Sequence, residues 1–101
     1  MAHDENTGKS PDEIAAGLGE RLRALRLAAD LTQAVVADKA GVSERSLRDL
    51  EAGQGSTVQT LVRVLKALGA DDVIDALAPR PAVSPLQLLK HKSRQRASGN
   101  R

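Results

Sequence analysis

The stretch QAVVADKAGVSERSLRDLEAG, residues 33–53, decides how this chain folds. It holds two short amphipathic segments that meet at Gly41, and each segment follows a hydroxyl residue able to cap a helix, Thr32 or Ser43. Glycine readily adopts the left-handed conformation that ends helices, so Gly41 is predicted to end the first segment and turn the chain. The stretch therefore predicts two short helices joined by a tight turn.

The apolar residues give each of these helices a buried side. In the first helix the predicted inward face consists of Val36, Ala37 and Ala40. We expect the helices to cross closely at Ala37, where a larger side chain would clash, and Val42 and Leu47 to fill the angle between them. Leu50 continues the buried side of the second helix. This is helix-turn-helix geometry, in which the second helix enters the major groove of DNA.

Three charged residues lie on the opposite, free side of the second helix: Glu44, Arg45 and Arg48. Arginine is the commonest base-contacting residue, because its guanidinium donates two hydrogen bonds to guanine, and glutamate can accept from cytosine N4. The alternative is a surface helix with scattered charges, which does not explain the turn and the matching apolar residues beside it.

Upstream, residues 1–9 are polar without periodicity and are predicted to be disordered. The sequence SPDE at residues 10–13 then predicts a helix start, with Ser10 as the cap, Pro11 in the first position and Glu13 completing a capping box. An apolar stripe recurring every three or four residues predicts one long helix. Its members are Ile14, Leu18, Leu22, Leu25 and Ala29.

Downstream, the sequence AGQGS at residues 52–56 ends the second short helix, and Ser56 with Gln59 forms another capping-box pattern. A fourth helix ending at Gly69 is predicted from Val58, Leu61, Val62, Leu65 and Leu68. A brief fifth helix from Asp71 carries Val73, Ile74 and Leu77. We therefore expect an all-α domain of five helices over residues 10–78, followed by a Pro-rich linker and basic tail over residues 79–101, with a last helix possible from Ser84.

Charge separates the tail from the rest of the chain. Residues 1–79 carry 9 Lys and Arg against 13 Asp and Glu, a balance of −4, whereas residues 80–101 carry 6 basic residues and no acid. The tail, more than the domain, suggests a polyanionic partner.

Composition excludes several classes of protein. Of the 101 residues none is Cys, Phe, Tyr or Trp, so thiolate metal sites, disulfides and base stacking on aromatic rings are absent. No apolar run is long enough to span a membrane, and we expect a cytoplasmic protein. No cluster of titratable residues predicts an enzyme, a metal site or a cofactor, and the GQGST loop lacks the lysine of a nucleotide-binding P-loop.

The sequence resembles the Cro and phage-repressor (XRE) family of helix-turn-helix regulators over about residues 18–77. The likeness rests on LGERLRALRLAADLTQAVVADKAGVSERSLRDLEAG followed by TVQTLVRVLKALGA. It implies a compact repressor-like domain in which Glu44, Arg45 and Arg48 face bases. Many relatives carry Gln at the position of Glu44, where it makes the usual contact with adenine. An acid at this position departs from the family, and the expected contact is cytosine instead.

The resemblance also implies roles for residues outside the free face. Gln33 would contact a phosphate and support Glu44, and Arg26 and Glu51 would bridge the first helix to the end of the third. The residues implied at the DNA backbone are Gln33, Ser43, Ser46, Gly55, Ser56 and Thr57.

Two functions are consistent with this sequence. The first is a dimeric repressor that binds a double-stranded DNA operator. The second is an antitoxin that binds a toxin protein and represses its own operon, because the tail SPLQLLKHKSRQRAS is similar to tails of regulators encoded beside HipA-like kinase toxins. For the tail itself, a DNA-binding arm, a toxin-docking helix carrying Leu86, Leu88 and Leu89, and a solvated end all remain open.

Overall fold

A computed structural model of the chain describes residues 8–82 and Leu86. Within residues 8–82 every regular element is helical: α1 (Pro11–Ala28), α2 (Gln33–Ala40), α3 (Glu44–Glu51), α4 (Val58–Ala67), the 3-10 helix η2 (Asp71–Val73) and α5 (Ile74–Leu77). The expected all-α fold is confirmed for this part. The domain limits at residues 10–78 remain a prediction, and the predictions for residues 1–7 and for the basic tail lie outside the described residues, except at Leu86.

The helix starts follow from local side-chain chemistry. Ser10 accepts a hydrogen bond from the Glu13 N–H while the Glu13 carboxylate accepts from the Ser10 N–H, which confirms the predicted capping box. The side chains of Thr32 and Ser43 likewise accept at the starts of α2 and α3. Each cap satisfies a backbone N–H that has no partner inside the helix, so these starts depend on a few neighbouring residues.

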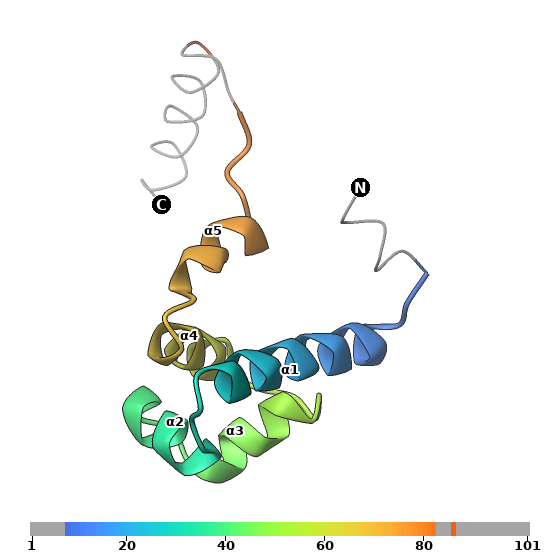
Figure 1. Ribbon diagram of the computed structural model, residues 1–101. Helices are drawn as coiled ribbons and strands as arrows, with labels where there is room; N and C mark the ends of the chain where they lie inside the picture. Colours follow the sequence, from blue (N-terminus) through green and yellow to red (C-terminus); the bar gives the residue numbers. More distant parts are fainter. Residues whose placement is uncertain (1–7, 83–85, 87–101) are drawn as a thin grey trace, which may run out of the picture.

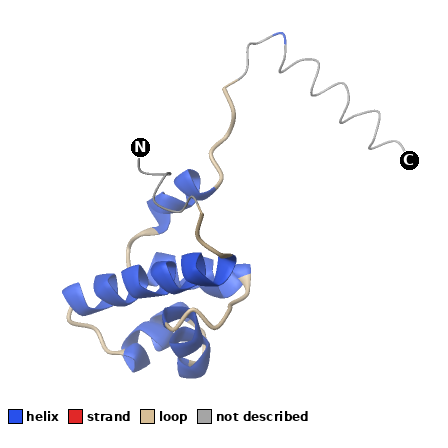
Figure 2. Ribbon diagram, turned by 90° about the vertical axis from the view of Figure 1, so that its right-hand side faces the viewer, coloured by secondary structure: helices blue, strands red, loops and turns tan. Residues whose placement is uncertain are grey.

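The helices pack in two levels around one aliphatic core (Figures 1 and 2). Figure 1 shows α1 running across the molecule, with α2 and α3 on one side of it and α5 extending from α4 on the other. Here α2 packs mainly against α4, and α1 mainly against α3. The buried core consists of Leu22, Val36, Ala37, Ala40, Leu47, Leu50, Val64 and Leu65.

The predicted apolar stripe of α1 is wrong for part of its length. Leu22 is buried and Leu18 packs on the core, but Ile14, Leu25 and Ala29 are exposed, Leu25 by 47%. The buried residues of α1 are instead Gly19, Leu22 and Arg26. A glycine and an arginine thus occupy the contact with α3, and hydrophobic periodicity counts neither of them.

The start of α4 also differs from expectation. Thr57, and not Ser56, is the N-cap, and its side chain accepts from the Thr60 N–H. Ser56 instead donates a hydrogen bond to the Thr57 carbonyl oxygen. With the start moved by one residue, Val58 lies in the first position of the helix and is 78% exposed, so it is no part of the core.

The predicted fifth helix is divided. Asp71–Val73 form η2 and Ile74–Leu77 form the single turn of α5, which packs chiefly against η2. Ile74 packs on the core, whereas Val73 and Leu77 stay 41% and 57% exposed. Among the described residues, the end of the domain therefore keeps apolar side chains exposed.

Candidate nucleic-acid interface

The turn between α2 and α3 sets the direction of α3. Gly41 ends α2 in the left-handed conformation at φ 70°, which confirms the predicted C-cap. The next residue, Val42, donates its N–H to the Ala37 carbonyl oxygen at 3.0 Å and packs its side chain on the core. The chain therefore leaves α2 by a fixed path before Ser43 starts α3. This arrangement is a helix-turn-helix.

Helix α3 has one buried and one free side. Leu47, Leu50 and Glu51 are buried against the rest of the domain. Glu44, Arg45 and Arg48 are exposed. None of these three forms an ion pair or a side-chain hydrogen bond with another residue of the range 8–82. The free side of α3 therefore presents one carboxylate and two guanidinium groups to solvent.

The two serines at the start of α3 have structural partners. Ser43 Oγ accepts from the Ser46 N–H at 3.0 Å and donates to Ser46 Oγ at 2.8 Å. Ser43 is exposed and Ser46 half-buried. Both hydroxyls are thus engaged at the N-cap, and a phosphate contact from either of them remains a prediction.

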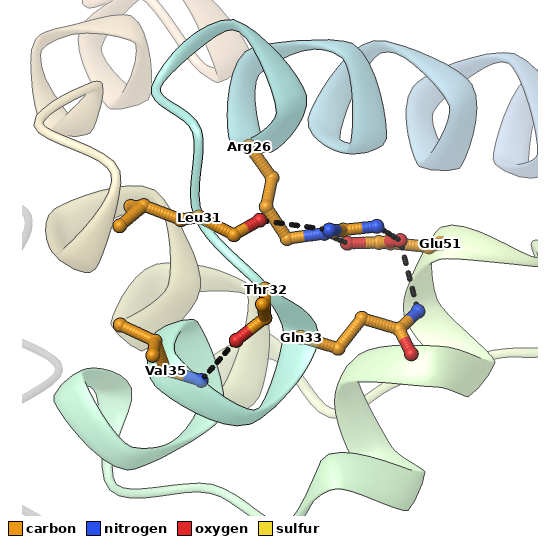
Figure 3. A network of polar contacts seen from close by, with 6 residues as sticks. All are labelled: Arg26, Leu31, Thr32, Gln33, Val35 and Glu51. Atoms are coloured by element: carbon orange, nitrogen blue, oxygen red, sulfur yellow. Dashed lines mark hydrogen bonds and ion pairs between the residues drawn. The ribbon is translucent and has the colours of Figure 1, made fainter.

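A polar network joins α1, α2 and α3 behind the free side (Figure 3). Arg26 donates from Nε to Glu51 Oε2 at 2.7 Å and from Nη2 to Glu51 Oε1 at 3.0 Å. Its Nη1 donates to the Leu31 carbonyl oxygen at 2.9 Å. Arg26 and Glu51 are 7% and 8% exposed, so the guanidinium fork and the carboxylate satisfy each other inside the domain.

The network also shifts the protonation of its members. Burial raises the pKa of the Glu51 carboxyl, but hydrogen bonds from Arg26 and Gln33, together with the charges of Arg26 and Arg23, outweigh it. The net pKa of Glu51 is lowered. The hydrogen bond to Glu51 raises the pKa of Arg26, so both residues stay charged over a wide pH range.

Gln33 differs from its expected arrangement. Its Nε2 donates to Glu51 Oε1 at 3.1 Å, so the amide lies against the Arg26–Glu51 pair. Support of Glu44 by this side chain is not seen, because its amide donates to Glu51. Gln33 is half-buried at the first position of α2. Its contact with a phosphate remains a prediction.

The loop between α3 and α4 ends in free backbone donors. The N–H groups of Gly55, Ser56 and Thr57 donate no backbone hydrogen bond within residues 8–82. Gly55 has φ 105°, and no atom lies within 4 Å of the position of an added Cβ. These N–H groups precede α4, where the helix dipole favours an anion. A phosphate contact at this loop remains a prediction.

Two glycines bring α1 close to α3, and hydrophobic periodicity did not predict this contact. A Cβ on Gly19 would lie 2.6 Å from the Leu50 carbonyl oxygen and closer still to that of Glu51. A Cβ on Gly53, where φ is 73°, would lie 2.7 Å from Ala16 Cα. The only signal in the sequence was a glycine inside an otherwise good helix, which suggests close packing.

Within residues 8–82 and at Leu86, no group of His, Cys, Asp or Glu has the arrangement of a metal site. In the same part of the chain, no helix combines the length and the apolarity needed to cross a membrane.

A comparison with known families agrees with this geometry. The family model described as a helix-turn-helix domain matches residues 17–77. The match begins within α1, includes α2, the turn and α3, and ends with α5. The chain belongs to the helix-turn-helix domain family.

Proposed function

We propose that this chain is a sequence-specific transcription regulator that binds double-stranded DNA through α3. The observation that carries the proposal is the two-sided character of this helix: Leu47 and Leu50 anchor it, while Arg45 and Arg48 are exposed and form no ion pair within residues 8–82. An α-helix of this kind fits the major groove, and paired donors of arginine match guanine O6 and N7.

The backbone contacts would hold the helix in the groove. The groups proposed for them are the side chains or N–H groups of Gln33, Ser43, Ser46, Gly55, Ser56 and Thr57. Phosphate contacts of this kind fix the orientation of the protein on the duplex and carry no sequence information of their own. Substitutions of the backbone-contacting residues and of the base-contacting arginines should therefore change the salt dependence of DNA binding differently.

We further propose that the regulator is a dimeric repressor of the Cro and phage-repressor (XRE) type, acting on the nucleoid in the cytoplasm. One small domain makes few base contacts, and two copies on two half-sites roughly double the interface. The exposed apolar residues Val73 and Leu77 at the end of the domain are suited to such pairing.

A second candidate function is an antitoxin that binds a toxin protein such as a HipA-like kinase. Val73 and Leu77 at the end of the domain are 41% and 57% exposed, and Leu86 in the tail is 64% exposed, so both segments offer apolar side chains to a partner. An antitoxin of this type also represses its own operon, so both functions use the same α3. Stable co-purification with a co-expressed kinase toxin, abolished by Leu86→Asp while the oligomeric state is unchanged, would favour this function.

Selection of bound duplexes from a random pool tests DNA binding and geometry together. We expect an enriched sequence with two half-sites in symmetric order. The control is Arg48→Ala, which should cost about 1–3 kcal/mol on the selected site and relax base preference at one position per half-site. Equal weakening on every sequence would mean that Arg48 contacts phosphate alone, and no enrichment would contradict the proposed function.

A further inference from the structure

Glu44 is an acid on a surface proposed to meet a polyanion, and the domain gives it no partner. It lies four residues before Arg48, a spacing at which opposite charges commonly pair along a helix. Nevertheless, no ion pair within residues 8–82 joins Glu44 to Arg48 or to any other residue. Its carboxylate is exposed at the first position of α3 and free to accept hydrogen bonds.

Major-groove chemistry limits what this carboxylate can contact. An ionised carboxylate only accepts hydrogen bonds, so it needs a donor. Guanine presents two acceptors and thymine presents an acceptor and a methyl group, so both disfavour it. Adenine offers its N6 donor beside the N7 acceptor, which repels the second carboxylate oxygen. Cytosine offers its N4 donor without a neighbouring acceptor and suits a carboxylate best.

We propose that Glu44 is a specificity-determining residue that selects cytosine at one position of each half-site, close to a guanine contacted by Arg48. This inference rests on the proposed function. Four helical residues span about 6 Å along α3. Base pairs are spaced by about 3.4 Å, so the cytosine and the guanine lie within about two base pairs of each other.

The carboxylate also acts against unmatched DNA. On guanine or thymine Glu44 gives up water and gains no donor, and on adenine the N7 acceptor opposes the bond to N6, while phosphates repel the carboxylate on any duplex. Replacing it with glutamine removes this repulsion and supplies both a donor and an acceptor, the pattern that matches adenine N7 and N6. Glu44→Gln should therefore bind random duplexes more tightly and change the preferred base from cytosine to adenine.

A purely structural role has a different signature. An acid in the first turn of a helix interacts favourably with the helix dipole. In that case Glu44→Gln changes the melting temperature and leaves base preference unaltered. Thermal melting of both proteins, measured beside the binding experiments, separates the two effects.

The experiment uses the full chain and the half-site obtained by duplex selection. Binding of the parent and of Glu44→Gln is measured on four duplexes that differ at the Glu44 position and four that differ at the Arg48 position. We expect the parent to prefer cytosine over adenine about ten-fold and Glu44→Gln to reverse this order, with the guanine preference unchanged. Arg48→Ala is the matched control, because it should lose the guanine preference and keep the cytosine preference.

The outcomes distinguish this inference from the proposed function. If the parent enriches a specific duplex but Glu44→Gln keeps the same preference at every position, the assignment of Glu44 is overturned and DNA recognition stands. If the parent enriches no duplex, both fail. A change of preference confined to one position per half-site supports the inference.

Discussion

Arg26 and Glu51 place a charged pair beside a core made of aliphatic side chains. Burying two charges costs free energy, and this pair recovers part of it through two direct hydrogen bonds and further bonds to Leu31 and Gln33. No buried side-chain N or O atom in the described part lacks a hydrogen-bond partner. Such a network is more sensitive to the loss of one member than to the replacement of both charges.

We therefore predict that Arg26→Ala lowers the free energy of unfolding by about 2–4 kcal/mol, because Glu51 stays buried without its cation. Urea unfolding measures this change. The matched control is Arg26→Met combined with Glu51→Leu, which removes both charges at similar volume and should cost less than Arg26→Ala. An unchanged unfolding midpoint for Arg26→Ala would show that the pair contributes nothing to stability.

Glu51 also predicts how stability depends on pH. Its folded pKa is lowered, so the folded state releases this proton more readily than the unfolded state. The stability from Glu51 is present above its unfolded pKa of about 4.3 and is lost as the pH falls through the folded value. Glu13, whose pKa is lowered by hydrogen bonds to Ser10, contributes in the same direction.

Urea unfolding from about pH 7 to about pH 3 checks this dependence. The parent should lose stability below about pH 4.3, and Glu51→Gln should lose less over the same range because its side chain does not titrate. Glu13→Gln, measured in parallel, removes the contribution of the α1 cap. Equal acid slopes for the parent and Glu51→Gln would contradict the assignment.

At the scale of elements, the sequence predicts what depends on neighbouring residues. The caps at Ser10, Thr32 and Ser43 and the left-handed Gly41 follow from residues within one turn, and all four were predictable. The contact face of α1 was not predictable from periodicity, because its burial of Arg26 depends on Glu51, which is 25 residues away in the chain. The resemblance to a known family was what implied this bridge. The exposed side of α3 was predictable from Leu47 and Leu50, but the partner of Gln33 was not.

The close approach of α1 to α3 gives a prediction at this scale. Alanine normally stabilises a helix relative to glycine by about 1 kcal/mol. Gly19→Ala should instead destabilise by about 1–3 kcal/mol, because its Cβ would meet the backbone of Leu50 and Glu51. Gly17→Ala lies in the same helix with no atom within 4 Å of its Cβ and should stabilise the domain. Thermal melting compares them, and equal shifts would contradict the close approach.

At the scale of the whole molecule, the uncovered apolar surface at η2 and α5 predicts a twofold dimer. Val73 and Leu77 are exposed although α5 is a single turn, and apolar surface of this kind favours self-association. Leu77→Asp should shift the dimer to monomer in sedimentation experiments at micromolar concentrations without lowering the melting temperature of the monomer. Leu27→Asp is the control, because Leu27 on α1 is 47% exposed and should leave the dimer intact. A monomeric parent bound as one copy per selected site would refute the dimer.

The charge division of the chain gives the last prediction. Residues 1–79 have a net charge of −4. A DNA duplex carries one negative charge per about 1.7 Å of its axis, so it repels this part of the chain. Residues 80–101 add 6 positive charges, and 5 of them follow the Pro-rich stretch at residues 79–85. A truncation after Ala78 should therefore weaken binding to all duplexes alike. It should also flatten the plot of log affinity against log salt by about 0.9 for each phosphate that the shortened chain no longer neutralises. Base preference should stay the same, because α3 is intact.

The same truncation separates the other two roles of the tail. If the tail binds a toxin instead, the salt slope stays unchanged and the truncated protein no longer retains a co-expressed toxin. If neither property changes, the tail is a solvated end with no part in binding.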